Sequence, residues 1–132
     1  MKRLLCGVLM MVCSVSWAEW ELCVISDDGI ITIYCDKSTI RKKGAISRMW
    51  DLVDFSIVQT PSGYRYMSDK AFWAYNCREE TMAVISVTWY SGAMGGGNVV
   101  FFGTRQERDW EWQPVSPGTA GEAKWKIACG KK

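Results

Sequence analysis

The sequence contains one convincing helix signal, at its C-terminal end, and the predicted helix finishes in a cysteine, Cys129. Thr119, followed three residues later by Glu122, forms a capping-box pattern typical of a helix start. Ser116-Pro117 offers an earlier start, because proline suits the first helical turn. Two nearby glycines each cost a helix about 1 kcal/mol relative to alanine, and they favour the later start.

One face of this segment is apolar, because Trp125, Ala128 and Cys129 share a stripe at helical spacing. Gly130 is suited to the left-handed stop that ends many helices. A helix this short is marginal in isolation, so the rest of the fold has to hold it. We therefore expect Cys129 to anchor the helix to a sheet through a disulfide with Cys77.

The first eighteen residues read as a secretory signal peptide, with Lys2 and Arg3 before an apolar run from Leu4 to Val15. Ser16 and Ala18 place small residues where a signal peptidase reads them, so the mature chain is expected to be one domain over 19–132. A membrane anchor is the alternative, but the run is shorter than the roughly 20 residues that span a bilayer. No cysteine follows a small residue in the way a lipidation signal requires.

Lys2 and Arg3 account for the formal net charge of +2, so the mature chain is close to neutral. Its densest basic run, residues 41–43, is short and reads as a solvated turn. A nucleic-acid-binding protein shows a larger basic footprint, so no nucleic-acid partner is expected. No apolar run after residue 18 has membrane length, and no stable membrane insertion is expected after cleavage.

Four cysteines remain after the predicted cleavage, and in an oxidising compartment an even number indicates two disulfides. Three connectivities are possible; Cys23 and Cys35 flank a predicted hairpin, which leaves Cys77 to pair with Cys129. A zinc site is the competing use of four cysteines. The chain has no CxxC spacing and no histidine, so we expect neither a metal nor another cofactor.

Between the termini the chain reads as about six strands in hairpin order. Residues 20–26 and 30–36 flank Asp27-Asp28-Gly29, a strong hairpin signal. Residues 36–40 are predicted as a turn and 41–44 as a polar loop. Further extended segments are expected over 45–58, 64–76, 81–90 and 98–103. The predicted fold class is α+β: a single antiparallel sheet with the C-terminal helix packed on it and tethered by a disulfide.

Two patterns resemble functional motifs. Asp51 and Asp54 are close enough in sequence for acid–base or metal chemistry, but their opposite parity sends them to opposite faces of a strand. We interpret both as solvent-side or strand-end residues with basic partners nearby. The glycine-rich stretch 91–97 lacks the Lys-Ser/Thr and the helix of a phosphate-binding loop, so it is interpreted as a flexible hairpin connection.

Dispersed positions across the predicted mature chain resemble the surface-adhesin protein E family: Trp20, Asp27-Asp28-Gly29, Tyr34, Asp36, Met49-Trp50, Asn76-Cys77, Tyr90-Ser91-Gly92, Pro114, Pro117 and Cys129. The resemblance implies an exported protein of a Gram-negative bacterium with a six-stranded antiparallel sheet and a disulfide-tethered C-terminal helix. It also implies surface display, possible dimerisation, and binding to host proteins such as vitronectin, laminin and plasminogen. The missing lipidation signal and the Cys23 and Cys35 pair depart from the family pattern.

The leading functional hypothesis is a non-enzymatic exported envelope or surface protein that binds another macromolecule, such as a host matrix protein. A soluble periplasmic domain that serves a bacterial partner or a stress response is the alternative, and thiol-redox chemistry by Cys23 and Cys35 is a minor one. Function is expected on the sheet face opposite the helix and in the loops 91–97 and 104–109. The candidate contact residues are Gly95, Gly96, Arg105, Arg108 and Trp110.

Overall fold

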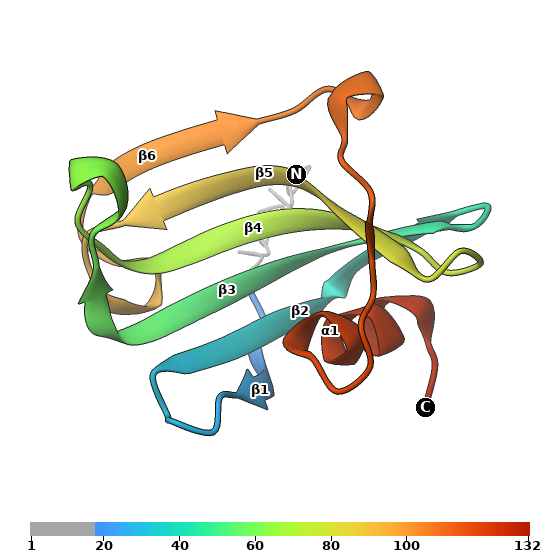
Figure 1. The fold of residues 1–132 in the computed structure, drawn as a ribbon, viewed down its shortest axis with the longest axis horizontal. Helices are drawn as coiled ribbons and strands as arrows, with labels where there is room; N and C mark the ends of the chain where they lie inside the picture. The colour runs from blue at the N-terminus through green and yellow to red at the C-terminus, as the bar shows by residue number, and fades with distance from the viewer. Residues whose placement is uncertain (1–17) are drawn as a thin grey trace, which may run out of the picture.

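A computed structural model describes residues 18–132, which form one antiparallel sheet with a single α-helix at the C-terminus (Figure 1). The strands are β1 (Glu21–Ile25), β2 (Ile31–Lys43), β3 (Ile46–Gln59), β4 (Tyr66–Asn76), β5 (Thr81–Tyr90), β6 (Val99–Thr104) and β7 (Gln113–Pro114). Neighbouring strands follow chain order from β1 to β6, and the short β7 pairs with the start of β5. The predicted fold class is confirmed, with β7 as an additional strand. The expected signal peptide, apart from its last residue, lies outside the described residues.

The predicted hairpin between β1 and β2 is confirmed, and side chains of its turn hold it. The Asp28 carboxylate accepts hydrogen bonds from the Ser26 hydroxyl at 2.6 Å and from the Ile30 N–H at 2.9 Å. Gly29 adopts a φ of 73°, in the left-handed region that glycine enters without steric cost. The turn therefore follows from the residue types at 26–30.

A β-bulge in this hairpin accompanies the disulfide between Cys23 and Cys35. Leu22 pairs with Tyr34 and Val24 pairs with Ile33, so Cys23 is the extra residue on β1. The two cysteine Cα atoms lie 5.9 Å apart, within the usual range for a disulfide.

The predicted turn at 36–40 and polar loop at 41–44 are wrong, because β2 continues through them to Lys43. Asp36 pairs with Trp50, and the next registered pair begins only at Arg41, so the residues between them bulge out of the ladder. Thr39 Oγ1 donates to the Asp36 carbonyl at 2.6 Å and accepts from the Trp50 N–H at 3.0 Å. Turn-forming side chains here shape a bulge inside a strand and do not end it.

Helix α1 (Ala120–Cys129) begins at the later of the two predicted starts. Thr119 caps it by accepting a hydrogen bond from the Glu122 N–H at 3.2 Å. Gly130 ends it in the left-handed conformation with a φ of 66°. The helix lies across one face of the sheet and contacts β1, β2, β3 and β4 (Figure 1). The Cys77–Cys129 disulfide tethers its last residue to the chain just beyond β4.

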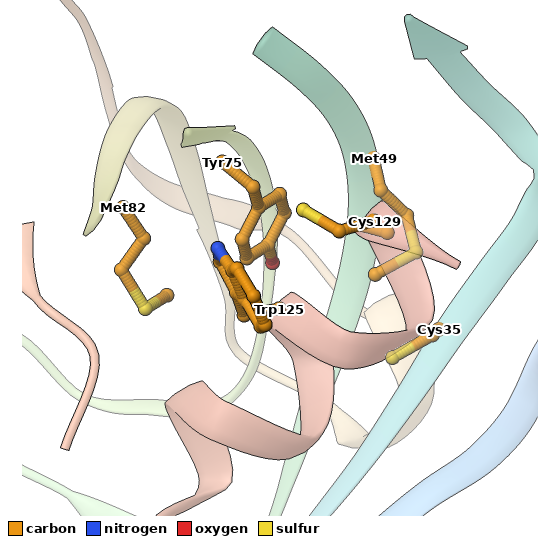
Figure 2. Close-up of a cluster of buried hydrophobic side chains, with 7 residues drawn as sticks. Cys35, Met49, Tyr75, Met82, Trp125 and Cys129 are labelled. Carbon is orange, nitrogen blue, oxygen red and sulfur yellow. The ribbon is translucent and has the colours of Figure 1, made fainter. Parts of the chain in front are cut away.

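The core lies between this helix and the sheet. Trp125 is 7% exposed and donates its indole N–H to the Asn76 carbonyl at 2.9 Å. The Ser47 hydroxyl donates to the Ala128 carbonyl at 2.6 Å. Figure 2 shows Trp125 and Cys129 above the sheet side chains that they cover, and the cluster comprises Cys35, Met49, Tyr75, Met82, Trp125, Ala128 and Cys129.

The helix covers only part of its face, and an aromatic cluster packs over the rest. Trp89 pairs with Asp69, which pairs with Val53, so Trp89 faces the same side as Asp51 beneath the helix. The Trp89 ring stacks on Tyr66 at 4.5 Å and packs against Phe101 at 4.5 Å. These rings form a second, smaller packing centre on the helix side of the sheet.

The loop 91–97 folds back over the opposite face of the sheet. The Ser68 hydroxyl donates to the Gly92 carbonyl at 2.6 Å and accepts from the Gly95 N–H at 2.8 Å. Asp54 accepts from the Met94 N–H at 2.9 Å. Hydrogen bonds from the side chains of Ser68 and Asp54 to the loop backbone thus hold the glycine-rich hairpin connection on the sheet.

Removing the Cys77–Cys129 bond should cost about 4 kcal/mol of unfolding free energy, because it closes a long loop in the unfolded chain. The change is the double substitution Cys77→Ala and Cys129→Ala, measured by urea unfolding of the mature protein. Amide hydrogen exchange should show protection lost first in α1. A loss below about 1 kcal/mol, with α1 still protected, would contradict the assigned tether.

Candidate interaction surface

The five predicted contact residues fall in two loops that lie at opposite ends of β6 (Figure 1). Gly95 and Gly96 precede this strand, whereas Arg105, Arg108 and Trp110 follow it. A Cβ atom on Gly95 would lie 2.8 Å from Cε of Lys70, so that glycine permits close packing of the loop on the sheet. The structure does not bring the five residues into one continuous surface.

The loop after β6 is held largely by its own residues. The Trp110 indole N–H donates to the Arg105 carbonyl at 3.2 Å, and the Arg105 guanidinium lies 3.0 Å from Glu111. The Arg48 guanidinium lies 5.2 Å from the centroid of the Trp110 ring. Arg108 is the most open of the three predicted contacts, with a side chain 79% exposed. A role for these residues in binding stays a prediction.

The face opposite the helix carries a groove with an aromatic floor. The rings of Trp50 and Phe72 stack there with centroids 4.9 Å apart and an interplanar angle of 14°. Register places them side by side, since Trp50 pairs with Phe72 across β3 and β4. The groove has a volume of about 500 Å³, and its lining residues are Ala18, Asp36, Ser38, Thr39, Arg41, Trp50 and Phe72. We call it the aromatic groove.

Charged groups of both signs border the aromatic groove. Asp36 lines one side, and a recess of about 260 Å³ continues towards Trp20 and Lys70. The Arg41 guanidinium donates to the carbonyls of Ser38 and Ile40 at 3.0 and 2.8 Å, which fixes its position beside the groove. Half-buried aromatic rings with arginine beside them are the composition of protein-binding hot spots.

An ion pair that was not predicted from the sequence joins the helix to the sheet. The prediction that Asp51 lies on the solvent side is wrong. Asp51 is 0% exposed and its carboxylate lies 2.8 Å from the Lys124 ammonium, itself only 6% exposed. The ammonium also lies 4.3 Å from the centroid of the Trp73 ring. The available signals were an acid within an apolar strand and a lysine four residues before Ala128 on the buried helix stripe.

Burial dominates the electrostatics around this pair. It raises the pKa of the Asp51 carboxyl, although Lys124 acts in the opposite direction. Burial and the Asp51 charge also raise the pKa of Asp69 to about 7, again opposed by Lys124. The Tyr75 hydroxyl, whose pKa is raised by burial and by Asp51, is itself buried. Asp51 has no solvent contact, so we assign the pair a structural role.

Within residues 18–132, no group of three or more His, Cys, Asp or Glu side chains is arranged to hold a metal ion. Across that same range, no helix has the length and apolar character needed to cross a membrane.

Together these features define a class of protein: a small, single-sheet α+β domain with its C-terminal helix tethered by a disulfide. The chain belongs to the surface-adhesin protein E family, whose model matches residues 20–130. No curated protein sequence matches the chain.

Solved structures of Haemophilus influenzae protein E have the same fold. A crystal structure of protein E from a non-typeable strain aligns with a TM-score of 0.58 and 13% identity, covering 89% of this chain and 79% of that one. A second crystal form aligns with a TM-score of 0.55 and 15% identity, covering 74% and 80%. Identities this low establish the shared fold.

Lys124→Met should lower the free energy of unfolding by about 3 kcal/mol, because it leaves Asp51 as a buried charge without its cation. Lys126→Met is the matched control on the same helix. It removes only an exposed contact with Glu122 at 3.5 Å and should cost less than about 0.5 kcal/mol. If urea unfolding showed the same loss of unfolding free energy in the two variants, the buried pair would contribute no more to stability than the exposed one.

Stability should fall as the pH rises from about 4 to 7, because folding raises the pKa of Asp69 from its ordinary 3.8 to about 7. The native state then holds a proton that the unfolded chain has released, so this contribution is largest at low pH and disappears above pH 7. Asp69→Asn should flatten the profile and gain at least about 1 kcal/mol at pH 7 relative to the wild type. Asp27→Asn, in the exposed β1–β2 turn, is the control. Parallel profiles for Asp69→Asn and the wild type would refute the shift.

Proposed function

We propose that the domain is a non-enzymatic exported adhesin that binds a host matrix or plasma protein through the aromatic groove. The observation that carries this proposal is the stacked Trp50–Phe72 pair, bordered by Asp36 and Arg41, on the face opposite the helix. Membership of the surface-adhesin protein E family supports the class of activity. The groove supplies rigid aromatic area with the Arg41 side chain beside it, which suits a protein segment better than an apolar small molecule.

Burial of the reactive groups supports the non-enzymatic assignment. Thiol–disulfide exchange needs an accessible sulfur; Cys35 is 0% exposed and lies in the core beneath the helix, which leaves only the half-buried Cys23 sulfur open to attack. The chain has no histidine to act as a general base. Of the two carboxyl groups whose pKa is raised by burial, Asp51 is 0% exposed and Asp69 is half-buried. These facts favour a structural role for the Cys23–Cys35 bond.

The proposed cleavage after Ala18 implies export, but it leaves two compartments in which the protein can act. Export without a lipidation signal favours a second candidate, a soluble periplasmic domain that serves a bacterial partner. Digestion of the protein by a protease added to intact cells would support surface display. Release by osmotic shock, together with protection on intact cells, supports the periplasmic candidate.

Trp50→Ala and Arg41→Ala should each weaken binding to an immobilised matrix protein by about 30-fold or more, the effect of losing an interface hot spot. Laminin, vitronectin and plasminogen are the probes, and binding is measured by biolayer interferometry. Arg108→Ala, at an exposed position of the loop after β6, tests the other predicted contact surface and should bind like the wild type if the aromatic groove makes the contact.

Urea unfolding of each variant checks that the fold is retained. If Arg108→Ala weakens binding while both groove variants bind normally, the groove is not the contact surface. If the wild-type protein binds none of the three probes and is released by osmotic shock, the adhesin assignment fails and the periplasmic candidate stands.

A further inference from the structure

Asp36 has a buried carboxylate whose two oxygens have different surroundings. The residue is 3% exposed in the full-length chain. Its Oδ1 accepts hydrogen bonds from the Ser38 N–H and the Ser38 hydroxyl. Among the described residues, its Oδ2 accepts only from the backbone N–H of Glu19, at 3.2 Å. The nitrogen that faces Oδ2 therefore belongs to the residue at the proposed start of the mature chain.

This carboxylate is the one buried charged group in residues 18–132 that forms no ion pair, although Lys70 lines the recess beside it. The other two buried charged side chains, Asp51 and Lys124, pair with each other. Arg41 lines the same groove, but its guanidinium donates to the carbonyls of Ser38 and Ile40. A buried carboxylate without a counter-ion is costly, so its environment calls for a positive group near Oδ2.

We propose that cleavage after Ala18 supplies that group, because it converts the Glu19 amide nitrogen into an α-ammonium that forms an ion pair with Asp36. A signal-peptidase-type endopeptidase adds one water across the Ala18–Glu19 peptide bond. Ala18 leaves with the new carboxylate, and the Glu19 nitrogen takes the protons to become –NH₃⁺. An α-amino group has an ordinary pKa of about 8, so the new terminus is charged at neutral pH.

The pair has a mechanical consequence for the sheet. It joins the beginning of β1 to the bulge in β2, at the edge strand next to the Cys23–Cys35 bond. A charge-assisted hydrogen bond is about twice as strong as a neutral one, so the edge is held more firmly after cleavage. The same cut removes Ala18 from the lining of the aromatic groove. Cleavage after Ala18 thus has two effects at once: it strengthens the edge of the sheet, and it opens the aromatic groove.

The test compares two forms of the protein: the proposed mature chain that begins at Glu19 with a free amine, and a form extended by Ser16, Trp17 and Ala18. In urea unfolding at pH 7, the Glu19 form should have a folded-to-unfolded ratio about tenfold higher. Asp36→Asn should abolish this difference. Asp27→Asn, an exposed acid in the adjacent turn, should leave it unchanged. An equal effect of Asp36→Asn in both forms would overturn the proposal.

A second measurement needs no substitution and stays decisive if Asp36→Asn fails to fold. The Glu19 α-amine should be acylated by a mild amine reagent at least tenfold more slowly in the native mature protein than in urea, as followed by peptide mass spectrometry. Equal rates would refute the ion pair, and so would an exported protein whose first residue is not Glu19. The inference rests on the proposed cleavage and not on adhesion, so a protein that binds no matrix component can still pass this test.

Discussion

The attachment of α1 to the sheet is the interaction on which the rest of the structure depends. Without the helix, the side chains of Met49 and Tyr75 on its face of the sheet would be open to water. Three kinds of contact hold it there: the Cys77–Cys129 bond at its end, the Trp125 indole in the core, and the buried Lys124–Asp51 pair. The ion pair adds little net stability by itself, but it penalises every arrangement that separates its partners. It therefore specifies where the helix lies more than how tightly it is held.

Aromatic rings cover the rest of the helix side of the sheet, and a loop covers part of the other side. The area that neither covers is where a partner can bind. On the helix side, rings around Trp89 pack on one another beyond the end of α1. On the other side, the Ser68 hydroxyl holds the glycine-rich loop through hydrogen bonds to the loop backbone. The stacked Trp50 and Phe72 lie where this cover ends. Their partial exposure follows from the limited reach of a short loop over a broad sheet.

Local patterns predicted most of the fold, because hairpin turns and helix caps are determined by neighbours in sequence. The Asp28-Gly29 turn, the Thr119 cap and the Gly130 stop all appear as their residue types indicate. The bulge after Asp36 was predicted as a turn, since the same side-chain hydrogen bonds serve both structures. The Lys124–Asp51 pair joins residues 73 apart in the chain, and no periodicity in the sequence indicates such a partner. The aromatic groove was missed for the same reason, because it depends on cross-strand register.

Helix α1 follows every strand in sequence, and this determines the order in which the domain can be completed. An exported chain crosses the membrane from its N-terminus, so all the strands emerge before the last turns of α1. Until then the sheet has an uncovered apolar face, and Cys77 has no partner because Cys129 emerges after every strand. The Cys77–Cys129 bond, unlike the Cys23–Cys35 bond within the first hairpin, can therefore form only after the helix has emerged. In this interval the sheet is nearly complete, and both its apolar face and the Cys77 thiol are exposed because the closing helix is still absent.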